Sequence, residues 1–211
     1  MGAGQLAFDF CQSPAKLKDV MNSPRALLKS FVTSVFVAGV FVAGAFVTAS
    51  FADTAKLDAL YAELQQDELP NWEEVEAKIW REWSRSGSAS MDLLLQRGRK
   101  AMQAGDTAKA IEHLTALTDH APDFAEGWNA RATAFFTADQ FGLSISDIQR
   151  TLALNPKHFG ALQGLGRILE ELDREKEALK AYEAAAAIHP HRDGLKESIE
   201  RLEKKVSGQD I

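Results

Sequence analysis

The chain has 211 residues and a composition that is ordinary for a globular protein, with 45% hydrophobic and 26% charged residues. Its formal net charge of −6 argues against a protein that coats nucleic acid, which needs a surplus of lysine and arginine. The single cysteine, Cys11, excludes an intrachain disulfide and a metal site built from several cysteines.

The N-terminal part has the layout of a bacterial secretory signal peptide. Positive charges at Arg25 and Lys29 precede an uncharged apolar run, residues 31–47, and the small residues Ser50 and Ala52 follow it. We therefore expect residues 21–52 to be a signal peptide that is cleaved before position 53, so that the rest is periplasmic or secreted. The alternative is an uncleaved inner-membrane anchor that leaves the remainder facing the periplasm, with the membrane contacted only through the apolar run.

With residues 1–20 included, the region before the apolar run is unusually long for a signal peptide. Met21 is an alternative start, so residues 1–20 are interpreted either as a translated extension or as sequence upstream of the true start codon. No cysteine follows the apolar run, which excludes a lipoprotein anchor.

Residues 53–90 are predicted to form a helical hairpin and a linker. Apolar residues at helical spacing indicate two amphipathic helices, with stripes formed by Leu57, Leu60, Tyr61 and Leu64 and by Trp72, Val75, Ile79 and Trp83. Asn71 and Glu74 are placed to form a capping box at the start of the second helix. The indole of Trp80 lies beside the stripe, so it either packs against the next unit, which is favoured, or contacts a partner. The serine-rich stretch 84–90 is typical of a linker.

A period of 34 residues organises the next hundred residues. Three of the six prolines, Pro122, Pro156 and Pro190, follow one another at this spacing. Laid out on the period, residues 91–190 divide into three units, 91–124, 125–158 and 159–190. Each unit is predicted to be a hairpin of two helices that buries its exposed apolar face against its neighbour.

Equivalent positions in the three units carry similar side chains. Small residues stand at position 8 and position 20, where two helices must approach closely, and bulky residues stand at position 4 and, in most units, at positions 11 and 24. The small residues are Gly98, Ala132 and Gly166, followed by Ala110, Ser144 and Ala178. Among the bulky residues, Trp128 at position 4 is predicted to lie in the core. Residues 191–211 follow as a capping helix and tail, with an apolar stripe of Leu195, Ile199, Leu202 and Val206.

These columns resemble the tetratricopeptide repeat family, over residues 91–190. The resemblance implies an all-α, right-handed superhelical solenoid of three units, to which the N-terminal hairpin adds a degenerate repeat and the last helix a cap. Position 7 departs from the family, which usually has leucine there, because the first two units carry Arg97 and Arg131. Position 11 of the first unit is the small Ala101.

The resemblance also implies a concave groove, lined by the first helix of each unit, in which partner peptides bind. The side chains expected in this groove include amides for peptide hydrogen bonds, two arginines for a carboxylate and two apolar contacts. Family members that grip a C-terminal carboxylate use lysines that this chain lacks. The ten groove residues are Gln96, Arg99, Met102, Asn129, Thr133, Phe136, Gly160, Gln163, Gly164 and Arg167.

Two glycines in this groove have no packing reason in the repeat pattern. Gly160 and Gly164 fall inside a predicted helix, so they do not form a phosphate-binding loop, which would follow a strand. Our hypothesis is that both leave room for the close approach of a partner backbone.

The sequence offers little for catalysis. The five histidines do not form a same-face pair with metal-ligand spacing, the glutamate pairs are adjacent along helices, and no G-x-S-x-G motif occurs. We therefore predict no catalytic residue, no cofactor, no metal and no nucleic-acid partner.

The predicted function is a non-enzymatic protein–protein interaction module, a periplasmic adaptor or assembly factor that binds a protein or peptide segment in the groove. Two alternatives stay open. One is a structural module that self-associates into a homo-oligomer, and the other is an accessory subunit of an envelope or cytochrome assembly machine.

Overall fold

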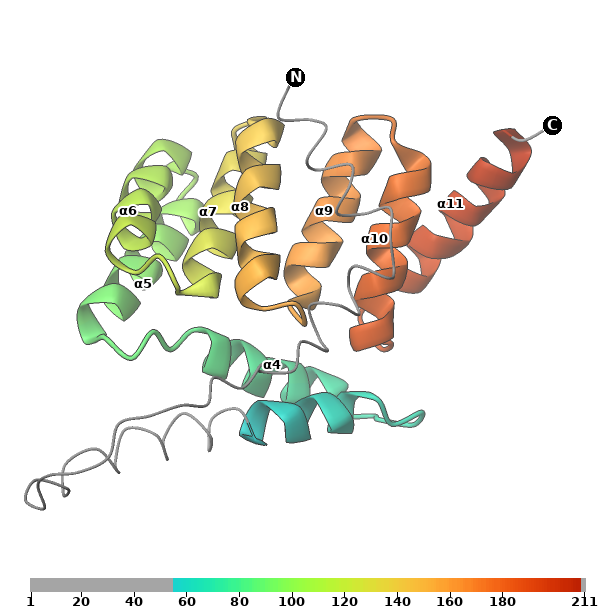
Figure 1. The fold of residues 1–211 in the computed structure, drawn as a ribbon, viewed down its shortest axis with the longest axis horizontal. Coiled ribbons are helices and arrows are strands. Elements are labelled where there is room, and N and C mark those ends of the chain that lie inside the picture. The colour runs from blue at the N-terminus through green and yellow to red at the C-terminus, as the bar shows by residue number, and fades with distance from the viewer. Residues whose placement is uncertain (1–54, 210–211) are drawn as a thin grey trace, which may run out of the picture. The chain divides into compact units, whose positions relative to one another are not determined.

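A computed structural model describes residues 55–209, and every regular element in that range is a helix (Figure 1). The helices of this range include none that is both long and apolar enough to cross a bilayer. The predicted extension, signal peptide and apolar run lie outside the described residues. A helix at residues 55–64 is followed by α4 (Trp72–Trp83), α5 (Ala89–Gln103), α6 (Thr107–His120), α7 (Ala125–Thr137), α8 (Phe141–Leu154), α9 (Phe159–Glu171), α10 (Glu175–Ile188) and α11 (Leu195–Gln209).

Helices α5 to α10 form three antiparallel hairpins that stack side by side in chain order (Figure 1). Each hairpin pairs the two helices of one 34-residue unit, and the second helix of a unit contacts the first helix of the next. The predicted all-α solenoid is therefore confirmed.

Small residues bring the two helices of a unit together, as their columns predict. A Cβ atom added at Gly98 would lie 2.5 Å from Cγ of Leu114, and one at Gly166 would lie 2.7 Å from the ring of Tyr182. In the middle unit the hydroxyl of Ser144 donates a hydrogen bond of 2.7 Å to the carbonyl of Ala132. A larger side chain at any of these positions would separate the helices or distort the core.

The turn inside each unit uses a residue with a left-handed backbone at position 15. Gly105, Asp139 and Asp173 have φ angles of 75°, 56° and 54°. In each unit the N–H of the following residue donates to a carbonyl five residues earlier, which satisfies an orphan carbonyl at the end of the first helix. The repeated Gly or Asp at this position is a sequence signal for the turn.

Arginine at position 7 of the middle unit is accommodated by an ion pair between the half-buried Arg131 and a buried carboxylate. Both Nε and Nη2 of Arg131 donate to the carboxylate of Asp147 on α8, at 2.7 and 2.9 Å, and Nη1 donates to Thr118 on α6. The guanidinium also lies 4.8 Å from the ring centre of Trp128. The prediction that Trp128 lies in the core is wrong, because this side chain is only half-buried and its Nε1 donates to the carbonyl of Pro122.

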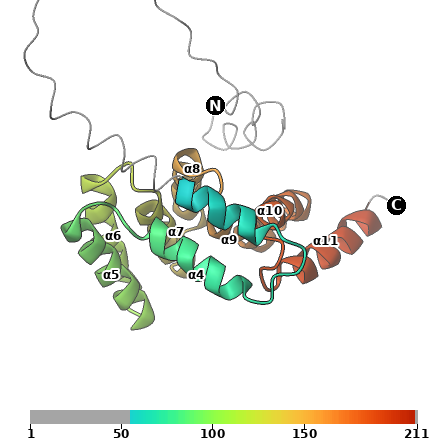
Figure 2. The same ribbon diagram turned by 90° about the horizontal axis from the view of Figure 1, so that it is seen from below.

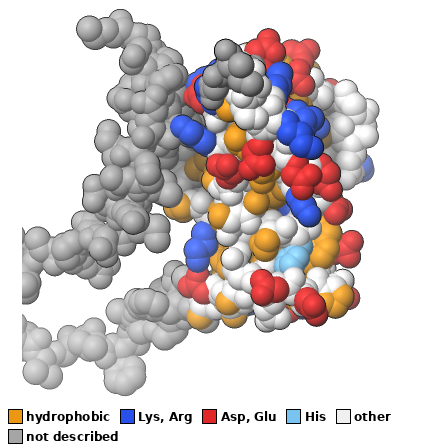
Figure 3. All heavy atoms as spheres, turned by 90° about the vertical axis from the view of Figure 1, so that its right-hand side faces the viewer, with side chains coloured by type: hydrophobic (Ala, Val, Ile, Leu, Met, Phe, Trp, Pro, Cys, Tyr) orange, Lys and Arg blue, Asp and Glu red, His pale blue; other side chains and the backbone are white. Residues whose placement is uncertain are grey.

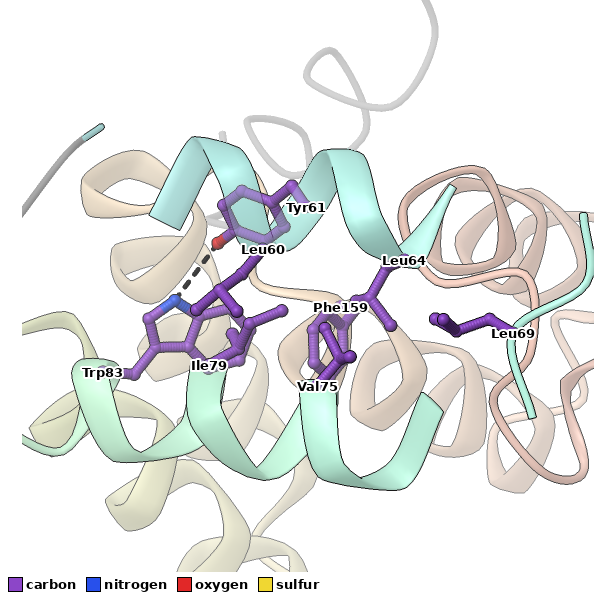
Figure 4. Packing of buried hydrophobic residues seen from close by; sticks show 8 residues of the cluster. All are labelled: Leu60, Tyr61, Leu64, Leu69, Val75, Ile79, Trp83 and Phe159. Carbon is purple, nitrogen blue, oxygen red and sulfur yellow. Dashed lines mark hydrogen bonds between the residues drawn. The ribbon is translucent and has the colours of Figure 1, made fainter. Parts of the chain in front are cut away.

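The N-terminal hairpin forms as predicted, from the helix at 55–64 and α4, and it lies across the ends of the repeat helices (Figure 2). Its two apolar stripes close over the first residue of α9, Phe159, whose ring is completely buried between them (Figure 4). Trp83 Nε1 donates to the hydroxyl of Tyr61 at 3.1 Å and ties the two helices together. The buried cluster consists of Leu60, Tyr61, Leu64, Leu69, Val75, Ile79, Trp83 and Phe159.

This placement differs from that of a repeat stacked before the first unit. The hairpin's buried cluster contains no residue of α5 or α6, and its polar contacts also go to the C-terminal unit. Gln65 donates to the carbonyl of Ile188 at 2.7 Å, and the ring Nε2 of His191 bonds to the carbonyl of Gln66 at 2.8 Å. The hairpin therefore covers the unit junctions around residues 158–160 and 187–192, instead of extending the array at its start.

Two local predictions for this region are corrected. Asn71 occupies the N-cap position of α4, but its side chain makes no capping hydrogen bond, so the capping box is absent. The predicted linker is shorter than expected, because α5 already begins at Ala89. The hydroxyl and N–H of Ser86 bind the carboxylate of Asp92, which fixes the entry into α5.

The last helix caps the array with a polar outer surface. Leu195 and Leu202 of α11 are buried against α10, and Arg201 and Lys205 pair with Glu170 and Glu175. The face of the molecule at this end carries acidic and basic side chains interspersed with isolated apolar ones (Figure 3). Such a mixed surface is what the exposed end of a helical solenoid requires.

Candidate functional site

A pocket of about 210 Å³ lies between α7 and α9, the first helices of the second and third units. Ile148 of α8 and Ile168 of α9 contribute buried apolar surface to it. Its walls also include two residues from outside the repeat units, Trp80 of α4 and Arg192 of the segment after α10.

Seven of the ten predicted groove residues line this pocket, and three do not. Gln96 and Met102 lie on α5, away from the lining, and Arg99 is engaged elsewhere. The seven that the structure brings together are Asn129, Thr133, Phe136, Gly160, Gln163, Gly164 and Arg167.

Arg99 is part of a structural network instead of a free carboxylate receptor. Its Nη2 donates to the buried carboxylate of Glu126 at 2.6 Å, and Nη1 donates to Ser84 at the end of α4. Reversing the charge at Arg99 would place a negative charge beside buried Glu126 and lower stability.

The second oxygen of Glu126 binds His158, which caps α9. His158 Nδ1 accepts the N–H of Ala161, so Nε2 carries the proton and donates to Glu126 at 2.9 Å. The imidazole is fully buried and stacks on the indole of Trp83, with 4.1 Å between ring centres. This histidine joins the hairpin to the second and third units, which is a structural role that its position at a junction only partly indicated.

The two amides in the pocket are already oriented by neighbours. Asn129 Nδ2 donates to Glu126 at 3.2 Å, which leaves its carbonyl oxygen free to accept. The carbonyl oxygen of Gln163 accepts from Nε of Arg192 at 2.6 Å, which leaves its amide N–H groups free to donate. Together they offer one acceptor and one donor to a peptide backbone.

Arg167 is the unpaired cation of the pocket. Its side chain is exposed, and within residues 55–209 it makes no hydrogen bond or ion pair. The guanidinium lies 5.8 Å from the ring centre of Phe136 on α7, a cation–π contact that holds it over the pocket. A carboxylate is the group that such an arginine binds best.

The two groove glycines have different explanations. A Cβ atom at Gly160 would lie 2.7 Å from Cη2 of Trp80, so this glycine makes room for the chain's own hairpin. The hypothesis that Gly160 leaves space for a partner backbone is therefore wrong. Gly164 has only Cδ1 of Ile148 near it, at 3.8 Å, and it faces the pocket.

Glu76 of α4 anchors the hairpin to the residues that follow α10. Its carboxylate accepts from Trp80 Nε1 at 2.8 Å, binds His189 Nε2 at 3.2 Å and pairs with Arg192. Burial raises the pKa of Glu76, but the hydrogen bonds from His189 and Trp80 and the positive charge of Arg192 outweigh burial and lower that pKa to about 2.

This shift predicts a pH-dependent stability. Because the pKa of Glu76 is lower in the folded state, its contribution is complete above the unfolded value of 4.5 and is lost as the pH falls towards about 2. Urea unfolding should show wild type more stable than Glu76→Gln at pH 6, with the difference shrinking between pH 4.5 and 2. Glu74→Gln, at an exposed carboxyl of the same helix, is the control. A difference that does not change with pH would contradict the assignment.

The histidines and acidic residues within 55–209 do not converge on a metal site. No set of three His, Cys, Asp or Glu side chains in residues 55–209 could hold a metal ion. The buried histidines, His158 and His189, contact carboxylates and aromatic rings of the hairpin interface.

Comparison with known sequences assigns the repeats. The tetratricopeptide repeat family matches residues 95–147 and 130–193. A TPR repeat-containing protein of Rhizobium etli is 34% identical over 154 residues, which is 72% of this chain and 76% of that protein. The chain belongs to the tetratricopeptide repeat (TPR) family.

Solved TPR structures share the fold. The first TPR domain of Spaghetti (RPAP3), bound to the HSP90 peptide SRMEEVD, is 24% identical with a TM-score of 0.54, over 56% of this chain and 93% of that one. The Yersinia enterocolitica type III secretion chaperone SycD, in complex with a peptide of the translocator YopD, is 14% identical with a TM-score of 0.53, over 56% of this chain and 95% of that one.

Within this TPR chain, sequence reasoning missed Arg192 as a pocket residue and left Trp80 open between packing against the next unit and contact with a partner. Both come from outside the repeat units, so counting positions within the family could not find them. The available signal was Phe159, a large aromatic residue at position 1, where the other units have Met91 and Ala125.

Proposed function

We propose that this TPR protein is a non-enzymatic interaction module that binds a segment of a partner protein in the pocket between α7 and α9. The observation that carries the proposal is the unpaired Arg167, held over an apolar pocket by Phe136 and flanked by two amides with free hydrogen-bonding groups. This combination suits a peptide, whose backbone needs both a donor and an acceptor and whose side chains need apolar and charged contacts.

The solved relatives support this use of the fold. The Spaghetti domain and SycD are TPR proteins whose structures hold peptides of other proteins. Three of the four tryptophans, Trp72, Trp80 and Trp83, make ring contacts within the chain. They therefore do not form an aromatic surface for a second copy, which argues against self-association through the hairpin.

Partner capture tests the pocket. Arg167→Glu should reduce capture of the native partner from cell extract at least tenfold, because it places a negative charge where a carboxylate is expected. The fold should be unaffected, since Arg167 has no structural ion pair in the described residues. Arg97→Glu is the matched control, because this arginine is also exposed but does not line the pocket. Equal capture by both variants would contradict the proposed site.

For the cellular location, we propose an exported adaptor or assembly factor, periplasmic or secreted after cleavage before Asp53. The layout of residues 21–52 supports this, with a charged region, an apolar run and a small-residue exit. N-terminal sequencing of the protein purified from its host should begin at Asp53. A product that retains residues 31–47 would instead be the anchored form.

A further inference from the structure

Trp80 extends from helix α4 of the hairpin to the pocket, and aromatic and hydrogen-bond contacts fix its position. Its ring centre lies 5.0 Å from that of Trp83 and 5.8 Å from that of Phe159, both in edge-to-face geometry, and Nε1 donates to Glu76. The far edge of the indole reaches α9 at Gly160, where a Cβ atom would collide with it. The indole is therefore a fixed wall at one end of the pocket.

Arg192 extends this wall and depends on the same hairpin. It pairs with Glu76 of α4 and donates to the carbonyl oxygen of Gln163 on α9. The hairpin thus also sets which groups of Gln163 face the pocket, namely its N–H donors. A three-unit solenoid without this hairpin would present neither the indole nor the oriented amide.

The opposite end of the pocket is marked by Arg167. Gly160, Gly164 and Arg167 follow one another on one face of α9, and seven residues of helix span about 10 Å. The bare Gly164 lies between them, so the space next to the indole is open to an incoming side chain. Beyond Arg167 the surface continues into a second, more polar hollow of about 330 Å³ beside α11, which Gln163 and Arg167 also line.

We propose that Trp80 is a specificity-determining residue of the partner site, supplied from outside the repeats. The occupant is a peptide segment with one bulky aliphatic side chain, packed between Trp80 and Gly164, and a carboxylate on Arg167. A peptide in the polyproline II conformation rises about 3.1 Å per residue and presents every third side chain on the same face. A separation of about 10 Å along α9 therefore places the carboxylate three residues from the aliphatic side chain. This inference rests on the proposed function, because it names the partner of the same pocket.

Synthetic peptides of the form Leu-Ser-Ser-Glu, and its reverse, with neutral flanks test the inference on the full chain. In the chain orientation that binds, replacing the glutamate by glutamine should weaken binding about tenfold, because a charge-assisted contact is lost. Replacing the leucine by alanine should weaken it by a similar factor. Trp80→Phe enlarges the pocket while keeping an aromatic ring in the interface. For a peptide that carries phenylalanine in place of the leucine, this variant should raise the affinity about tenfold relative to the leucine peptide. It should leave the ratio of the affinities for the glutamate and glutamine peptides unchanged.

The two affinity ratios, phenylalanine to leucine and glutamate to glutamine, test the role of Trp80 and the proposed function separately. Arg167→Gln should abolish the difference between the glutamate and glutamine peptides and leave the phenylalanine-to-leucine ratio unchanged. If Trp80→Phe scales all peptides equally, or changes none, the indole is not part of the site, although the proposed function survives through the Arg167 result. Gly160→Ala, which pushes on the indole from α9, should alter the same size ratio and serves as the second variant. Absence of binding by every peptide, or equal binding by all, would overturn the proposed partner chemistry.

Discussion

Phe159→Ala is expected to lower the free energy of unfolding by about 3–5 kcal/mol, the usual cost of emptying a fully buried aromatic site. Phe159 is completely buried, although it is the first residue of its helix and lies at a junction between units. The side chains around it come from both helices of the N-terminal hairpin, so its loss leaves a cavity that one helix alone cannot fill. Urea unfolding followed by circular dichroism measures the change.

The matched control is Leu143→Ala on α8. Leu143 is 51% exposed, so its truncation should change the free energy of unfolding by less than about 0.5 kcal/mol. Tryptophan fluorescence should also change in Phe159→Ala, since Trp80 and Trp83 both contact that ring. Equal stabilities for the two variants would mean that the hairpin does not pack on α9.

Glu126→Ala is expected to lower the free energy of unfolding by about 2–3 kcal/mol, the cost of leaving buried polar groups without a partner. Glu126 is 2% exposed and binds both Arg99 and the buried Nε2 of His158. Arg99 is partly exposed and can turn to water, whereas His158 cannot. Glu126→Gln should recover part of the loss, because its amide oxygen can still accept from His158.

Chemical denaturation measures the free energy of unfolding of these variants, with Glu171→Ala as the control. Glu171 is an exposed carboxylate on α9 with no hydrogen bond or ion pair in residues 55–209, so its removal should have almost no effect. If Glu126→Ala were as stable as Glu171→Ala, the link from α5 through Glu126 to α9 would contribute nothing to stability.

The repeats were predictable because their determinants are local and recur. Each unit has small residues in the two close-contact columns, bulky residues in most of the other core columns and a proline at its end. A departure at one position, such as Arg131, is therefore outweighed by the agreement of the other columns. The structure shows how the exception is tolerated, through a buried partner, Asp147, sixteen residues away. Sequence alone could not anticipate that pairing, since nothing marks Asp147 as buried.

The position of the hairpin was not predictable from its own sequence. Its apolar stripes predict that this face is buried, but they do not identify the part of the chain that buries it. The partner surface is made by residues far along the chain, Phe159 and His189 among them, and is assembled only when the repeats have stacked. Arg99 was misassigned for the same reason, because its partner Glu126 comes from the next unit.

Photo-crosslinking from position 133 shows whether a partner protein occupies the pocket between α7 and α9. Thr133 is an exposed residue of α7 that lines the pocket, and Leu143 of α8 is an exposed residue that does not. In living cells of the host, irradiation should join a partner protein to position 133 of the full chain and not to position 143, and Arg167→Glu should abolish the product. Crosslinking at position 143 but not at position 133 would contradict the assignment of the partner site to the pocket between α7 and α9.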